Sequence, residues 1–271
     1  MMWSCKDVYY VSDSTALLAE ETGRSLLCQF PGINFNEEKI PFVRTREKAE
    51  EAREHILRNS GGLAPLVFCT VLDPEIRKIL DTPEVEFYDI FGSVLDRLEL
   101  SLEAKPLREP GFSRQTDNIN LARKVEAIDY SIKHDDGTRT REYDLAEVIL
   151  LGVSRSGKTP VCIYIATHLG LKAANFPLTA EYLDRYELPM DIVRNRKKVV
   201  GLTTTPRLLH PIREQRYPGS RYAKQETCAR ELSQAEGIYQ KYGIPMTHTG
   251  GRSIEETATR VMQILGLKGR R

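Results

Sequence analysis

The feature that most constrains this chain is a stretch in its middle, residues 148–159, which reads VILLGVSRSGKT. An apolar run leads into the pattern Gly-x-x-x-x-Gly-Lys-Thr, and a second apolar run, PVCIYIA at 160–166, follows it. The order predicts a strand, a glycine-rich loop and a helix, which is the context that a phosphate-binding P-loop requires. A glycine turn that only caps a helix is the alternative interpretation, and the flanking apolar runs argue against it.

The residue types of this loop suit phosphate for physical reasons. Glycine accepts backbone conformations that side chains forbid, so successive N–H groups can turn inward around an anion. The helix that follows directs the positive end of its dipole at the same point. Lys158 is predicted to meet the terminal phosphates, and the Thr159 hydroxyl to ligate Mg²⁺. The predicted nucleotide contacts are Gly152, Val153, Ser154, Arg155, Ser156, Gly157, Lys158 and Thr159.

Before the loop, apolar and charged segments alternate in a way that predicts a parallel sheet covered on both faces. We expect an N-terminal α/β domain over residues 1–105. Its predicted strands are 7–13, 40–43, 66–72 and 85–90, and its predicted helices begin near residues 15, 46, 74 and 93.

Residues 106–143 are expected to connect this domain to the next as a linker followed by a helix. The helix is predicted over 118–133, with Leu121, Val125, Ile128 and Ile132 forming a packing stripe. The sequence His134-Asp135-Asp136-Gly137 ends it.

Residues 144–271 are expected to form a second, P-loop kinase-like α/β domain. Further strands are predicted at 172–177, 198–203 and 244–247, with a charged connection at 181–196. Helices are predicted at 206–216, at 221–242 with Ser220 as its cap, and from a capping box at Ser253 and Glu256 to Leu265.

Composition excludes several classes of protein. The 271 residues carry a formal net charge of +1, which gives no overall field for nucleic acid or for an anionic membrane. No segment approaches the length of a membrane-spanning helix or a signal peptide. The five cysteines are scattered and form no C-x-x-C pair, which is typical of reduced thiols. We therefore expect a cytoplasmic protein with no nucleic-acid or membrane partner.

A P-loop identifies the bound group but not the reaction. The guanine-reading pattern Asn-Lys-x-Asp is absent, and the strand at 198–203 ends in threonines where many ATPases place a Mg²⁺-binding Asp. The best candidate acids are Asp135 and Asp136, which could supply a Mg²⁺ ligand and a base for an incoming hydroxyl. An ordinary Asp-Asp-Gly turn is the alternative. Considered by itself, His134 is better interpreted as a residue that favours the dipole at a helix C-terminus than as a catalytic acid or base.

Two further clusters carry weaker signals. Arg213, Arg216 and Arg221 flank Pro218-Gly219 and could form a lid over a nucleotide, although solvated charges are the favoured interpretation. The segment 12–15, Ser-Asp-Ser-Thr, follows a predicted strand where parallel sheets place ligands, but an N-cap is the favoured interpretation.

Taken together, these residues resemble the bifunctional regulatory proteins of phosphoenolpyruvate synthase and of pyruvate, phosphate dikinase. The resemblance extends in order over nearly the whole chain. It is carried by Tyr10–Asp13 with Thr15, Pro65–Phe68, Ala127–Tyr130, His134–Gly137, Leu150–Pro160, Ala173–Pro177, Ser220–Ala223 and Ser253–Glu256.

The resemblance implies two opposed activities. Such proteins inactivate their target by phosphorylating a threonine with ADP as donor, and they reactivate it by a phosphate-dependent removal that releases pyrophosphate. It implies catalytic roles for Lys158 and for His134, Asp135 and Asp136, with the base left open between the two acids. Dikinase-directed members tend to carry Ser where this chain has Gly157, so the implied target is phosphoenolpyruvate synthase.

Two other functions stay open on the sequence alone. A P-loop in a compact α/β domain with an arginine lid could belong to a small-metabolite kinase. The missing acid after the strand at 198–203 could indicate a nucleotide-sensing module without catalysis. The same chemistry on pyruvate, phosphate dikinase is the remaining alternative, and the sequence leaves a homodimer open.

Overall fold

The computed structural model describes residues 5–61, 63–112 and 118–267. The chain divides into two compact units, Met1–Thr116 and Asp117–Arg271, and each has its own sheet and its own core. The helix expected over 118–133 lies within the second unit. The segment 106–143, which we set apart from both domains, is therefore split between the two units.

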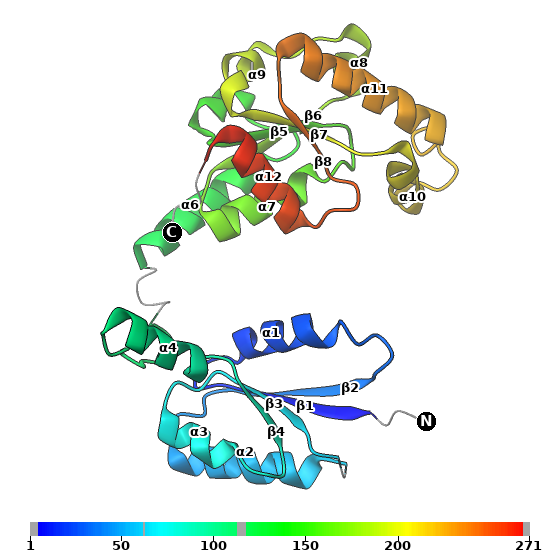
Figure 1. Cartoon of the computed structure of the whole chain (residues 1–271). Helices are drawn as coiled ribbons and strands as arrows, with labels where there is room; N and C mark the ends of the chain where they lie inside the picture. Colours follow the sequence, from blue (N-terminus) through cyan, green and yellow to red (C-terminus); the bar gives the residue numbers. More distant parts are fainter. Residues whose placement is uncertain (1–4, 62, 113–117, 268–271) are drawn as a thin grey trace. The chain divides into compact units, whose positions relative to one another are not determined.

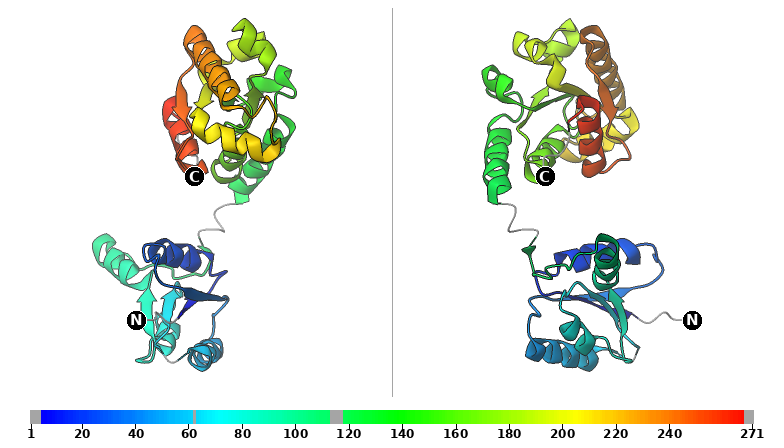
Figure 2. Two further views of the ribbon diagram at one scale, coloured as in Figure 1. Left: turned by 90° about the vertical axis from the view of Figure 1, so that its right-hand side faces the viewer. Right: turned by 60° about the vertical axis from the view of Figure 1, so that its left-hand side comes forward.

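The first unit is a parallel sheet of four strands in the order β2-β1-β3-β4, with helices on both faces (Figures 1 and 2). Val8, Tyr10 and Phe68 pack under α1, while Tyr9 and Val11 on the opposite face pack against α2 and α3. The elements are β1 (Lys6–Val11), α1 (Leu17–Leu27), β2 (Phe35–Ile40), α2 (Arg46–Asn59), β3 (Leu66–Cys69), α3 (Pro74–Leu80), β4 (Glu86–Asp89) and α4 (Gly92–Leu102).

Two expectations for this unit were wrong. The second strand lies at Phe35–Ile40 and not at 40–43; its central residues are exposed, because an edge strand paired only with β1 needs no apolar run. The predicted N-cap also fails. Ala16 occupies the cap position of α1 with φ 61° and no side-chain hydrogen bond. The Asp13 carboxylate instead accepts a 2.8 Å hydrogen bond from the Leu72 amide.

The second unit has a parallel sheet in the order β6-β5-β7-β8, the same arrangement as in the first unit. β5 is central and fully buried, because its alternate residues face two different helix layers. Ile149 and Leu151 pack toward α11, whereas Val148 and Leu150 pack toward α7 and α12 (Figure 1). The strands are β5 (Val148–Gly152), β6 (Ala173–Pro177), β7 (Val199–Thr203) and β8 (Met246–His248).

The helices of the second unit alternate with these strands. The capping box at Ser253 and Glu256 is confirmed, with both of its hydrogen bonds formed. Two short 3₁₀ helices lie at Thr140–Leu145 and Arg196–Lys198. The α-helices are α6 (Asn118–Lys133), α7 (Lys158–Leu169), α8 (Ala180–Arg185), α9 (Met190–Arg194), α10 (Pro206–Arg216), α11 (Gln225–Tyr242) and α12 (Ile254–Leu265).

Three expectations for this unit were wrong. The connection at 181–196 contains α8 and α9, and α11 begins at Gln225, four residues beyond the predicted start. On α6 the predicted packing stripe is largely exposed, with Leu121, Val125 and Ile132 each more than half accessible. The buried face of α6 instead carries Ala127, Tyr130 and Ser131.

Among the helices of the described residues, none is both long enough and apolar enough to cross a lipid bilayer.

Candidate functional site

The glycine-rich loop connects β5 to α7 at the carboxyl end of the sheet, as the sequence predicts. Because β5 lies between β6 and β7, the loop opens where parallel sheets place ligands. Helix α7 begins at Lys158 with Gly157 as its N-cap and no side-chain cap. Within the described part of the chain, no protein acceptor pairs with the amides of Gly157, Lys158 and Thr159. These N–H groups form the positive set of donors that an anion requires.

The two glycines of the loop serve different purposes. Gly157 has φ +94°, a conformation that side chains rarely adopt. Gly152 does not have a positive φ. It is needed for space, because a Cβ at this position would lie 2.3 Å from the Ser156 hydroxyl. The conformational reason expected for both glycines therefore applies to Gly157 alone.

Lys158 is almost completely buried beside the loop, and its Nζ donates a 3.0 Å hydrogen bond to the Val153 carbonyl. Burial lowers the pKa of Lys158 to about 8, and the neighbouring Asp136 and Asp135 partly oppose that shift. A phosphate would supply the counter-charge that the protein itself only partly provides.

The turn at Asp135, Asp136 and Gly137 is held against β6. The Asp136 amide donates to the Asn175 side-chain oxygen at 3.1 Å, and the Gly137 amide donates to the Asn175 carbonyl at 3.0 Å. Asp136 has φ 49° and Gly137 has φ 76°, so the chain reverses tightly here. This anchoring brings both carboxylates from the end of α6 to the start of α7.

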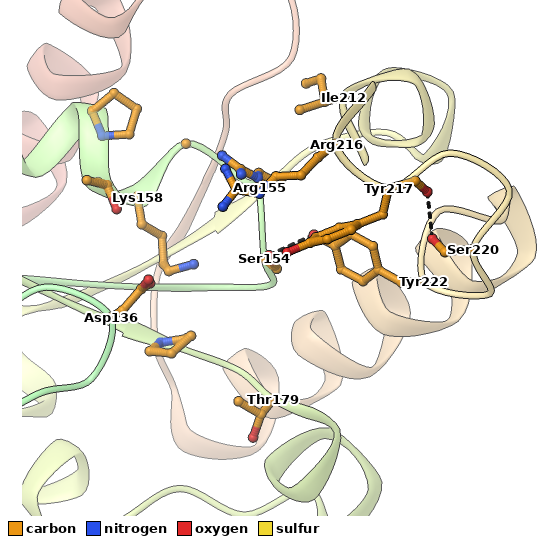
Figure 3. A pocket seen from close by; sticks show the side chains of 14 residues that line it. Asp136, Ser154, Arg155, Lys158, Thr179, Ile212, Arg216, Tyr217, Ser220 and Tyr222 are labelled. Atoms are coloured by element: carbon orange, nitrogen blue, oxygen red, sulfur yellow. Dashed lines mark hydrogen bonds between the residues drawn. The ribbon is translucent and has the colours of Figure 1, made fainter. Parts of the chain in front are cut away.

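The two acids have different surroundings. Asp135 accepts a 2.9 Å hydrogen bond from the Thr159 hydroxyl and a second one from the Asn175 amide group. Asp136 faces the main cleft, where its carboxylate lies near Lys158 (Figure 3). Asp135 therefore orients the loop threonine, whereas Asp136 is directed toward any bound molecule.

His134 does not line this cleft. Its ring is 2% exposed and stacks on Tyr130 with centroids 3.8 Å apart. Nδ1 lies 2.7 Å from the Tyr130 carbonyl, and Nε2 lies 3.0 Å from the Glu142 carboxylate. These contacts hold the C-terminal end of α6 in place. His134 therefore stabilises the position of the Asp-Asp-Gly turn without facing the cleft.

The main cleft has a volume of about 990 Å³, and its far wall comes from α10 and the loop after it. Tyr222 donates a 2.8 Å hydrogen bond from its hydroxyl to the Ser154 side chain (Figure 3). The Arg216 guanidinium lies 5.8 Å from the centre of the Tyr217 ring. Sequence reasoning assigned no role to Tyr217, and Tyr222 appeared only within the resemblance at Ser220–Ala223. The wall residues are Ile212, Arg216, Tyr217, Ser220 and Tyr222.

Arg213 contradicts the expectation of a solvated charge. It is fully buried, and it donates to the Ser154 carbonyl at 3.1 and 3.3 Å and to Glu231 at 2.7 Å. Its guanidinium also lies 4.3 Å from the centre of the Tyr222 ring. The glycine-rich loop is thus tied to α10 and α11 through one arginine. Arg216 and Arg221 are exposed, as expected.

A divalent cation would have few protein ligands here. The described residues contain no group of three or more His, Cys, Asp or Glu side chains that could hold a metal ion. The Thr159 hydroxyl and the Asp135 carboxylate are hard oxygen donors in direct contact, which fits the preference of Mg²⁺ for a few protein oxygens completed by phosphate and water.

Comparisons with known proteins extend these observations. A family model described as Kinase/pyrophosphorylase matches residues 8–262. Proteins described as "Putative phosphoenolpyruvate synthase regulatory protein" are similar over nearly their full length. The one from Desulfotalea psychrophila is 47% identical over 264 residues, 97% of each chain. The one from Laribacter hongkongensis is 39% identical over 269 residues, 98% of each chain. The one from Alkalilimnicola ehrlichii is 41% identical over 268 residues, 98% of this chain and 97% of the other.

Proposed function

Because this chain belongs to the kinase/pyrophosphorylase family, we propose that it is a bifunctional regulator of phosphoenolpyruvate synthase. In one direction it transfers a phosphoryl group from ADP to a threonine of that enzyme and inactivates it. In the other direction it uses inorganic phosphate to remove the group, releases pyrophosphate and restores activity. The names of relatives that are 39–47% identical over nearly their full length favour this target over pyruvate, phosphate dikinase.

The two directions are chemically balanced. In the first, the threonine oxygen attacks the β-phosphorus of ADP, the bond to AMP breaks, and the hydroxyl proton passes to a base. In the second, an oxygen of inorganic phosphate attacks the phosphothreonine, pyrophosphate forms, and the departing threonine oxygen takes a proton back. Both directions place a diphosphate-like group in the loop, so a single anion site serves both.

The arrangement in the cleft supports specific roles. Lys158 and the free amides at the start of α7 neutralise the charge of the transferred group. Asp136 faces the same space and is the base that orients the threonine hydroxyl. Asp135 accepts a hydrogen bond from Thr159, and these two residues would hold a Mg²⁺ ion, which would supply further neutralisation of charge. The observation that carries the proposal is that Asp136 and Lys158 line the same cleft beside the loop, close enough for the carboxylate to influence the pKa of the lysine.

The direct test uses ADP labelled in the β-phosphate together with purified phosphoenolpyruvate synthase. We expect label on a threonine of the synthase and an equal amount of AMP. Adding unlabelled phosphate afterwards should release labelled pyrophosphate. Transfer with ATP alone, or release of label as free phosphate, would contradict the donor or the reverse reaction.

Variants of the two acids separate their roles. Asp136→Asn should lower the transfer rate about 100-fold or more while ADP still binds, because only the base is lost. Asp135→Asn should raise the Mg²⁺ concentration needed for activity. Asp129→Asn, which removes an exposed carboxylate on α6, is the matched control and should behave like the unaltered protein. Equal transfer rates in Asp136→Asn and Asp129→Asn would contradict the base assignment.

A small-metabolite kinase is the second candidate, because the cleft wall carries an accessible arginine, Arg216. A panel of small hydroxyl acceptors with ATP or ADP tests it. Turnover of any of them at a rate above that of the synthase would favour this candidate.

A further inference from the structure

We propose that the nucleoside half of ADP occupies a second cavity, on the β7–β8 side of the glycine-rich loop, and that the main cleft receives the target threonine. We call this cavity of about 440 Å³ the nucleoside cavity. The inference rests on the proposed function, since it assigns the two halves of that reaction to two neighbouring spaces.

The walls of the nucleoside cavity suit a flat, largely apolar group with a few polar edges. Leu208, Ile212 and Ile254 line it, and each keeps more than 40% of its surface accessible. The Thr204 hydroxyl also lines it and has no hydrogen-bond partner within the described ranges of the chain. Accessible apolar side chains around a few free polar groups are typical of small-molecule sites.

The two cavities meet at the loop. Arg155, Gly157, Pro160 and Ile212 line both of them, so one extended ligand can cross from one cavity into the other over the start of α7. A diphosphate bound to the free amides there would have its terminal phosphate near Lys158 and its other end near Pro160.

The in-line geometry of phosphoryl transfer determines which cavity receives the nucleoside and which receives the target threonine. In phosphoryl transfer the attacking and leaving oxygens lie roughly in line on opposite sides of the phosphorus. Asp136, the proposed base, is held on the β6 side of β5 by Asn175. The leaving AMP must then lie on the opposite side of β5. Thr204 follows β7 and Thr249 follows β8, and both line the nucleoside cavity on that side.

The aromatic wall of the main cleft is the alternative position for the nucleobase of ADP. Tyr222 is already engaged, since Arg213 covers its ring and its hydroxyl bonds to Ser154. Tyr217 meets the Tyr222 ring edge-on and remains about half exposed. This wall lies in the same cleft as Asp136, where a protein segment has to enter.

The test separates the nucleoside from the phosphates. In the double variant Leu208→Ala/Ile254→Ala, ADP should bind about tenfold more weakly, because two apolar contacts are lost. Binding of pyrophosphate, which has no nucleoside, should stay within about twofold of the unaltered protein. Isothermal titration of each ligand gives both values without relying on turnover. In activity assays the KM for ADP should rise while the KM for inorganic phosphate stays constant.

Matched controls make the outcome specific. The double variant Leu121→Ala/Ile132→Ala removes the same residue types from the exposed face of α6 and should leave both affinities unchanged. Tyr217→Ala should likewise leave ADP affinity unchanged. Equal loss of ADP and pyrophosphate binding, no loss of either, or ADP weakened only by Tyr217→Ala would each overturn the assignment.

Failure of the proposed function would be recognised separately. If the unaltered protein transfers no phosphate to the synthase, yet the Leu208→Ala/Ile254→Ala variant loses ADP affinity and keeps pyrophosphate affinity, the nucleoside cavity stands and the target assignment falls.

Discussion

Folding changes the acid–base chemistry of Lys158, because burial lowers the pKa of its ammonium group to about 8. A buried ammonium group is costly unless opposite charge lies nearby, and here the carboxylates of Asp136 and Asp135 partly offset the loss of solvent. Among the described residues, the only hydrogen bond of the Lys158 ammonium group goes to the neutral Val153 carbonyl. The side chain is therefore poised to gain a stronger partner, and a phosphate oxygen is the natural one.

This gives a prediction for pH. Without a ligand, the pKa of Lys158 in the folded protein is about 8, and binding of a phosphate group favours its charged form. Below pH 8 the lysine is already protonated, whereas above it binding must first take up a proton. ADP affinity should therefore fall as pH rises beyond 8, by up to about tenfold per pH unit. Titration calorimetry from pH 7 to 9.5 measures this, and Lys158→Met should bind weakly with no such slope. An unchanged slope in that variant would assign the titration to another group.

At the level of elements, the loop depends on helices that follow much later in the sequence. Arg213 of α10 bonds to the Ser154 carbonyl and is neutralised by Glu231 of α11. A buried pair of this kind adds little net stability, but breaking it leaves one charge without compensation. Through this contact, α10 and α11 hold the glycine-rich loop in position at Ser154.

Glu231→Gln should accordingly lower the free energy of unfolding by about 2 kcal/mol, since the Arg213 charge remains buried. It should also weaken pyrophosphate binding, because the loop loses its fixed support. Urea unfolding followed by circular dichroism measures the first effect. Glu181→Gln removes an exposed ion pair on α8 and should cost almost nothing. Equal costs for the two variants would show that burial of Arg213 has no energetic consequence.

The capping box of α12 gives a second prediction at this scale. Ser253 accepts from the Glu256 amide, and Glu256 accepts from the Ser253 amide. Ser253→Ala should lower the local stability of α12 by about 1 kcal/mol, because one amide loses its acceptor. Hydrogen exchange of the α12 amides reports this directly, with the α2 amides as internal reference. Ser253→Asp should restore protection; if it does not, the loss has another cause than capping.

For the molecule as a whole, the two units repeat one strand order but only the second carries the glycine-rich loop. Each unit packs its sheet against its own helices, and the two cores share no residues. All residues that line the main cleft and the nucleoside cavity belong to the second unit.

Residues 118–271 alone should therefore fold and bind ADP with an affinity within about twofold of the full chain. Circular dichroism checks folding, and titration with ADP checks the site. A fragment that folds but does not bind ADP would show that the first unit contributes to the nucleotide site. Transfer to the synthase is then measured separately, to find what the first unit adds.

The sequence alone determined the features that depend on neighbouring residues. The glycine-rich loop, the strand before it and the helix after it occupy consecutive positions, so spacing and residue type were enough to predict them. The capping box at Ser253 and Glu256 was predictable for the same reason. The α/β class followed from alternation along the chain, which local propensity largely controls.

Tertiary structure decided what depends on residues distant in the sequence. Burial of Arg213, the different surroundings of Asp135 and Asp136, and the exposed stripe on α6 follow from which faces pack together. The charged edge strand β2 was not predicted because its sequence lacks an apolar run. It is held in the sheet by its hydrogen-bonded pairing with β1, which the local sequence does not reveal. Local pattern fixes the conformation of a segment, but the charge and solvent around each side chain are set by its partners in space.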